Sequence, residues 1–141
     1  MSIKIGIING PNLNLLGTRE TGVYGTSSLE ELESSLRLSF PDITFSFFQS
    51  NVEGEIINAL HKMATDCRGI IINPAGYSHT SVSIADAIAA INCEVIEVHI
   101  SNIHAREEFR HNSITGSKCL GVISGMGIDG YLLAADFLRR R

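Results

Sequence analysis

Apolar residues form five short, nearly continuous runs, at residues 3–8, 43–48, 69–73, 94–100 and 120–123. Runs of this length predict buried strands, because a strand covered on both faces has little place for polar side chains. Between the runs, apolar residues recur at the three- and four-residue spacing of a helix face. This spacing predicts helices over residues 28–40, 50–64, 81–91 and 128–141, and a helical turn within residues 104–110.

Strands that alternate with helices predict an α/β fold with a doubly wound, five-stranded parallel sheet, since right-handed crossovers place helices on both of its faces. The flavodoxin-like strand order 2-1-3-4-5 is the expected arrangement. The chain has 141 residues and shows no repeat, linker or low-complexity segment. Residues 1–141 are therefore expected to form a single domain that is large enough to bury a full core.

Polar and glycine-rich segments follow each predicted strand, at residues 9–24, 49–51, 73–79, 101–110 and 125–130. The carboxyl ends of parallel strands lie at one edge of the sheet, and ligands of such folds bind outside that edge. The sequence therefore predicts one site, built from these five segments.

The first of these segments is long for a connection inside a compact domain, which is typical of a lid or a binding loop. It holds Arg19 and Tyr24 among Gly17, Gly22 and Gly25, so it could move as a flap. Converting a tyrosine to its phenolate near neutral pH costs about 4 kcal/mol. A guanidinium about 4 Å away supplies about that much at an effective dielectric near 20. An arginine-assisted tyrosine base is one interpretation, and a loop tyrosine packed on an arginine stem is the other.

Glu97 and His99 are two residues apart on the fourth predicted strand, so they share one face of the sheet. A carboxylate beside an imidazole fixes its tautomer and favours its charged form. The pair is either an acid–base element or a partly buried polar pair at the end of a strand.

Cofactor motifs are weak in this sequence. Residues 125–130 spell G-x-G-x-x-G, but no strand and no acidic residue about 20 positions on follow them, which favours a tight turn over dinucleotide binding. The sequence lacks the P-loop motif, and Asn9 and Asn12 stand where a phosphoacceptor domain needs carboxylates. The histidines and cysteines lack metal-ligand spacing, so neither a metal nor a cofactor is expected. A non-catalytic module that binds flavin or a phosphorylated metabolite, and a pure assembly protein, remain alternatives.

Composition and charge narrow the possible classes of protein further. The chain has 11 basic and 15 acidic residues and a net charge of -4. It therefore lacks the excess of positive charge that would indicate nucleic-acid binding. Its three cysteines are odd in number and never form C-x-x-C, which fits reduced thiols in the cytoplasm. No apolar run is long enough for a signal peptide or a membrane span. A cytoplasmic protein without a membrane partner is expected.

Several long motifs, in order along nearly the whole chain, resemble those of type II 3-dehydroquinate dehydratases. They are N-G-P-N-L-N-L-L-G-T-R-E at 9–20 with Tyr24-Gly25, Q-S-N-x-E-G-E at 49–55, I-N-P-A-G-Y-S-H-T-S-V-S-I-A-D-A at 72–87, E-V-H-I-S-N-I-H-A-R-E-E-F-R at 97–110 and G-x-G-x-x-G-Y at 125–131. The resemblance implies a cofactor-independent hydro-lyase of the shikimate pathway. Such an enzyme removes water from 3-dehydroquinate by anti elimination through an enolate.

The resemblance also implies roles for individual residues. Tyr24 would be the base, Arg19 would stabilise its phenolate, Asn12 would position a water, and His99, oriented by Glu97, would be the general acid. The implied substrate contacts are Asn73, His79, Ile100, Ser101 and Arg110, and Asp86 would reach the site from a neighbouring subunit. The family assembles as dodecamers of four trimers, so a homo-oligomer is expected.

Overall fold

The computed structural model describes residues 2–18, 20–25 and 27–141, and within them five strands form one parallel sheet of order β2-β1-β3-β4-β5. The strands are β1 (Ile3–Asn9), β2 (Ile43–Gln49), β3 (Gly69–Asn73), β4 (Glu94–His99) and β5 (Gly121–Ser124). The predicted fold class and strand order are confirmed.

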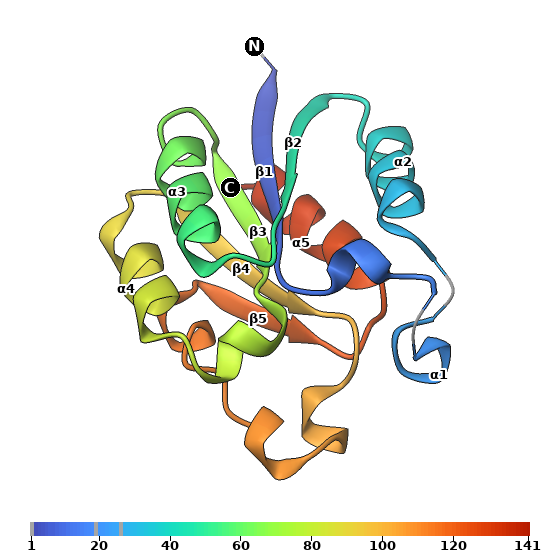
Figure 1. Ribbon diagram of the computed structural model, residues 1–141. Helices are drawn as coiled ribbons and strands as arrows, with labels where there is room; N and C mark the ends of the chain where they lie inside the picture. Colours follow the sequence, from blue (N-terminus) through green and yellow to red (C-terminus); the bar gives the residue numbers. More distant parts are fainter. Residues whose placement is uncertain (1, 19, 26) are drawn as a thin grey trace.

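Helices cover both faces of the sheet (Figure 1). Helices α2 (Leu29–Ser39) and α5 (Asp129–Arg139) pack on one face, and α3 (Glu53–Met63) and α4 (Val82–Ala90) pack on the other. The start of α2 is the predicted one, because the Ser28 side chain accepts a hydrogen bond from the Glu31 backbone N–H. Each face has its own apolar cluster, as a sheet buried on both sides requires.

Short helical segments lie in the connections after β1, β3 and β4. The α-helical turn α1 (Thr21–Tyr24) and five 3₁₀ turns occupy segments that follow strands: η1 (Leu13–Leu15), η2 (Ala75–His79), η3 (Ile103–Ala105), η4 (Glu108–Arg110) and η5 (Gly116–Lys118). Gly22 therefore lies inside a helical turn, whereas Gly17 and Gly25 adopt positive φ angles. The helical turn expected within residues 104–110 is two separate 3₁₀ turns.

The G-x-G-x-x-G segment forms a tight turn between β5 and α5. Gly125 and Gly127 have φ angles of 92° and 59°, and their N–H groups donate to the carbonyls of His99 and Ile100. At Gly130 an added Cβ would lie 3.1 Å from Val98 Cγ1, so a side chain would push α5 away from β4. The segment fixes the end of β4 and the start of α5.

The phenol of Tyr131 joins α5 to the ends of β1 and β3. Tyr131 is fully buried; its hydroxyl donates to Asn9 Oδ1 at 2.6 Å and accepts from Asn73 Nδ2 at 3.0 Å. Burial raises the pKa of Tyr131 well above its ordinary value, so the phenol keeps the proton that it donates. Because Asn9 and Asn73 are partners in the sheet register, this one hydroxyl ties together the last rung of two strands and a helix.

We expect Tyr131→Phe to lower the free energy of unfolding by about 1–3 kcal/mol, because Asn9 Oδ1 and Asn73 Nδ2 lose a buried hydrogen-bond partner while the packing changes little. Urea unfolding measures the loss. Tyr77→Phe is the control, since the Tyr77 hydroxyl donates at the surface to the Asn51 carbonyl and should cost under about 1 kcal/mol. Equal losses in the two variants would contradict the role of Tyr131.

Candidate active site

A cavity of about 140 Å³ lies at the carboxyl edge of the sheet. The residues that line it come from the segments after β1, β3 and β4 and from the ends of those strands: Pro11, Asn12, Leu13, Tyr24, Asn73, Ala75, Gly76, His79, His99, Ile100, Ser101, Ile103, Arg106 and Arg110. The cavity suits a small metabolite, because sites for drug-sized ligands occupy about 300–1,000 Å³. Segments 9–24, 73–79 and 101–110 converge here as expected, whereas segments 49–51 and 125–130, also expected to build the site, do not line the cavity.

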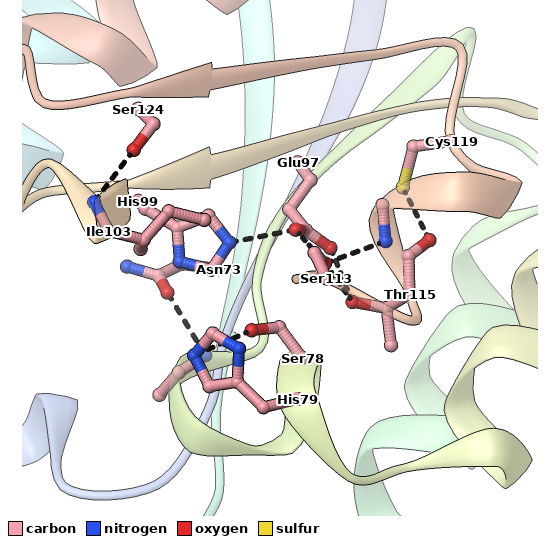
Figure 2. Close-up of polar contacts among 12 residues, drawn as sticks. Asn73, Ser78, His79, Glu97, His99, Ile103, Ser113, Thr115, Cys119 and Ser124 are labelled. Atoms are coloured by element: carbon pink, nitrogen blue, oxygen red, sulfur yellow. Dashed lines mark hydrogen bonds and ion pairs between the residues drawn. The ribbon is translucent and has the colours of Figure 1, made fainter. Parts of the chain in front are cut away.

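One side of the cavity carries a buried imidazole–carboxylate pair. His99 is the last residue of β4, and its Nε2 lies 2.7 Å from Glu97 Oε2 (Figure 2). Glu97 is 0% exposed and His99 5%. Since a carboxylate accepts, Nε2 carries the hydrogen, and Nδ1 is the ring nitrogen left for a bound molecule.

Another side of the cavity carries a phenol with a guanidinium beside it. Arg106 Nη1 donates to the Tyr24 hydroxyl oxygen at 2.6 Å, and the guanidinium carbon lies 5.2 Å from the centre of the Tyr24 ring. The same Nη1 lies 3.3 Å from Ser101 Oγ, which holds the guanidinium in the cavity wall. A charged donor aimed at a phenol oxygen stabilises the phenolate, so this geometry suits a tyrosine base.

Arg106 is a site residue that sequence reasoning missed. It belongs to the polar segment after the fourth strand, but its position directly after η3 gave no reason to pair it with Tyr24, 82 positions away. Arg19, the cation expected there, lies outside the described residues.

The Asn12 side of the cavity is shaped by an unusual turn. Asn12 has a φ angle of 70°, a left-handed conformation that asparagine tolerates better than most residues. Its backbone N–H donates to Asn51 Oδ1 at 2.9 Å, and Gln49 Nε2 donates to that oxygen and to the Gly10 carbonyl. An added Cβ at Gly10 would lie 2.6 Å from the Pro74 carbonyl oxygen, so only glycine allows this close approach. The segment after β2 thus holds the Asn12 turn in place.

Asn73 and His79 are held by the turn that follows β3. Asn73 Oδ1 accepts from the N–H of Ala75, while its Nδ2 binds Tyr131, so its amide orientation is defined. His79 Nδ1 lies 2.8 Å from the Asn112 carbonyl oxygen and must carry the hydrogen. The rings of His79 and His99 stack with centroids 6.2 Å apart, which places two imidazoles side by side at the cavity.

Three further residues expected from sequence line the cavity beyond β4. Ile100 is buried and Ser101 is half-buried. Arg110 Nε donates to Glu107 Oε2 at 3.1 Å, which leaves the two terminal nitrogens of its fork for a ligand. These residues surround the cavity with an apolar contact, a hydroxyl and a cation.

Asp86 does not reach the cavity of its own chain. It lies exposed on α4, whose buried residues Ile84, Ala85, Ala87 and Ile88 face the sheet. Val82 on the same helix is 60% exposed. The expected contribution of Asp86 to a neighbouring subunit stays a prediction.

A second, larger hollow of about 520 Å³ lies between β2 and α3. Several of its charged groups already have partners within the protein. Lys4 Nζ lies 2.7 Å from Asp66 Oδ2, and Glu55 accepts a short hydrogen bond from Ser50. Lys4 and Lys62 line this hollow, and neither lines the smaller cavity. It has no pair of side chains placed like Tyr24 and His99, so we assign the chemistry to the smaller cavity.

Neither a metal-binding cluster nor a membrane-spanning helix is found in residues 2–18, 20–25 and 27–141. No group of three or more His, Cys, Asp or Glu side chains among them could hold a metal ion. In the same part of the chain, every helix is too short or too polar to cross a membrane.

Known proteins are similar to this chain in both sequence and fold. The family described as dehydroquinase class II matches residues 3–139. A protein named 3-dehydroquinate dehydratase from an Exiguobacterium species is 53% identical over 137 residues, which cover 96% of this chain and 94% of the relative. A protein of the same name from Clostridium botulinum is 49% identical over 137 residues, which cover 96% of this chain and 93% of the relative.

Solved structures give the same relationship. The type II dehydroquinase of Butyrivibrio crossotus superposes with a TM-score of 0.95 at 44% identity and covers 98% of each chain. The type II dehydroquinase of Propionibacterium acnes also reaches a TM-score of 0.95, at 40% identity, over 100% of this chain and 99% of the other. Because the family match and these relatives extend over nearly the whole chain, this protein belongs to the class II dehydroquinase family.

Proposed function

We propose that this chain is a hydro-lyase that converts 3-dehydroquinate to 3-dehydroshikimate, in the shikimate pathway that leads to aromatic amino acids. The observation that carries the proposal is one small cavity lined by both a phenol beside a cation, Tyr24 with Arg106, and an imidazole beside a buried carboxylate, His99 with Glu97. An elimination of water needs these two groups, a base for the proton and an acid for the departing hydroxyl.

The first step removes a proton from C2 of the substrate. Tyr24, as its phenolate, takes this proton, and the electron pair of the C–H bond moves to the C3 carbonyl oxygen to form an enolate. Arg106 and Arg19 stabilise the phenolate by their positive charge. Asn12 holds a water against the enolate oxygen, where negative charge develops.

The second step expels the hydroxyl group of C1. His99 gives a proton to this oxygen, so that it leaves as water, and the enolate electrons form the double bond between C1 and C2. Glu97 orients the imidazole through its 2.7 Å hydrogen bond to Nε2. Base and acid then differ from their starting states by one proton each, which solvent returns.

Other residues of the cavity bind the substrate. Arg110 pairs with its carboxylate, because a guanidinium fork matches two oxygens. Asn73, His79 and Ser101 bind its oxygen atoms and Ile100 contacts its ring.

The purified protein should produce the conjugated enone from 3-dehydroquinate, which an absorbance assay follows directly. Tyr24→Phe should keep the fold and lose turnover by about 10²–10⁴-fold or more, because general-base catalysis supplies about that factor. Wild-type protein without dehydratase activity would refute the proposed function, and an active Tyr24→Phe variant would refute only the role of Tyr24.

Arg106→Ala should lower kcat by about 10²-fold, because it removes the charge beside the phenol oxygen, and Arg106→Lys should recover only part of it. Arg37→Ala is the matched control, since Arg37 also lies over an aromatic ring, 4.8 Å from the centre of Phe47, but on α2 away from the cavity. Arg19→Lys should likewise recover little relative to Arg19→Ala. Wild-type kcat in Arg106→Ala would show that this cation is structural.

We also propose that the chain works as a homo-oligomer in the cytoplasm, a dodecamer of four trimers in which Asp86 completes the site of a neighbouring subunit. The support is the family resemblance together with the exposed positions Val82, Asp86 and Ala89 on α4, beside a buried face that meets the sheet. The three free thiols fit a reducing compartment.

Shared sites predict complementation between inactive variants. Tyr24→Phe and Asp86→Ala, each inactive alone, should regain activity when they are dissociated, mixed and reassembled, because some sites then combine an intact Tyr24 with an intact Asp86 from another chain. The assay measures the recovered turnover, and each variant reassembled alone is the control. Mixed oligomers as inactive as their parents would exclude a cross-subunit role for Asp86.

A further inference from the structure

The carboxylate of Glu97 is fully buried, and three side chains contact its two oxygens. Oε2 receives hydrogen bonds from His99 Nε2 at 2.7 Å and from Ser113 Oγ at 2.5 Å. Oε1 receives one from Thr115 Oγ1 at 2.5 Å. Figure 2 shows the three donors grouped around this one carboxylate, with the two hydroxyls on the side away from the imidazole.

The hydrogen positions follow from what each group can donate. Ser113 Oγ accepts from the N–H of Gly116 at 2.8 Å, so its single hydrogen is free to point at Glu97. The two O–H···O distances fall in the range of about 2.5–2.7 Å that is typical of a hydroxyl bound to an ionised carboxylate. Both hydroxyls therefore donate to Glu97, and the 3.2 Å contact between Ser113 Oγ and Thr115 Oγ1 holds no hydrogen.

An ionised carboxylate in such a place depends on its donors, because burial of a charge is costly unless it is paired and hydrogen-bonded. The titratable groups that face the pair are few. Cys119 lies on one side, and burial together with the charge of Glu97 raises the pKa of its thiol, so it stays neutral. His79 stacks on His99 at 6.2 Å on the other.

The segment that carries the two hydroxyls is held to the same turn as His79. The N–H of Ile114 donates to the Ser78 carbonyl at 2.7 Å, and His79 Nδ1 donates to the Asn112 carbonyl at 2.8 Å. Residues 112–115 thus contact His79 directly and His99 through Glu97. The hydroxyls of Ser113 and Thr115 cannot move away from Glu97 without disturbing these two hydrogen bonds to residues 78 and 79.

We propose that Ser113 and Thr115 are positioning residues for the general acid: their hydroxyls hold Glu97 as an anion, so that it keeps His99 oriented and protonated. This inference rests on the proposed function, in which His99 gives the proton to the departing hydroxyl. Neither residue touches the substrate, so both act through Glu97.

Thr115→Val tests the inference, since it keeps the shape of the side chain and removes the donor. We expect kcat to fall by about 10- to 100-fold, the worth of a hydrogen bond to a charged group, while KM changes much less. The pH profile of kcat should also differ from that of the wild type, because loss of the Thr115 donor alters the Glu97–His99 pair. Thr115→Ser keeps the hydroxyl and should recover most of kcat.

Ser117→Ala is the matched control, because Ser117 donates to the Ile114 carbonyl at the exposed side of the same loop. It should leave both kcat and the profile unchanged. Ser113→Ala is the second test variant and should repeat the effects of Thr115→Val, so that the inference does not depend on one substitution.

Nitrogen NMR of the His99 ring separates this inference from the proposed function. Without substrate, the ring-nitrogen resonances of His99 in Thr115→Val or Ser113→Ala should differ from those of the wild type at the same pH, whether or not the wild type turns over 3-dehydroquinate. An active wild type with folded variants that retain its kcat, its pH profile and its His99 resonances would overturn the inference and leave the proposed function intact.

Discussion

Parallel strands of one sheet all end at the same edge, and this constraint governs the rest of the molecule. Where the strands stop, backbone and side-chain polar groups gather with no further strand to pair with. The last rung of β1 places Gln49, Asn9 and Asn73 side by side. Asn9 and Asn73 are each 3% exposed. Polar groups this deeply buried must find partners within the protein, since burying them unpaired is costly.

The partners come from segments that are distant in the chain, and they make the edge rigid. Tyr131 enters from α5 to satisfy both asparagines, and Glu97 is satisfied from the segment after η4. Among the described residues, every buried side-chain nitrogen and oxygen has a hydrogen-bond partner. A base and an acid held in such a frame lose little freedom when a substrate binds, which is how positioned groups contribute to catalysis. The proposed acid, His99 at the end of β4, is more deeply buried than the proposed base, Tyr24, which lies on the short helix α1.

The sequence by itself determined the elements, the strand order and the edge of the sheet at which polar segments gather. Apolar runs and helical spacing are local patterns, and crossover handedness then leaves few ways to assemble them. The two-residue period of a strand was enough to put Glu97 and His99 on one face. The position of polar segments after each strand placed Asn12, Asn73 and Arg110 at one edge, and motif resemblance attached roles to them. Element ends shifted by a few residues; α3, for instance, begins at Glu53 and not at Ser50.

Only the tertiary structure decided which side chains touch one another at that edge. Arg106 lies beside Tyr24 from 82 positions away, and Thr115 reaches Glu97 from 18 positions away. Nothing in a period of two or of 3.6 residues encodes such pairs, because they depend on how connecting segments pack after the sheet has formed. Asp86 is exposed on α4 and does not reach the cavity of its own chain, so the catalytic role proposed for it depends on contact with another chain. Local patterns specify elements, whereas contacts between distant residues are set by the packing of those elements.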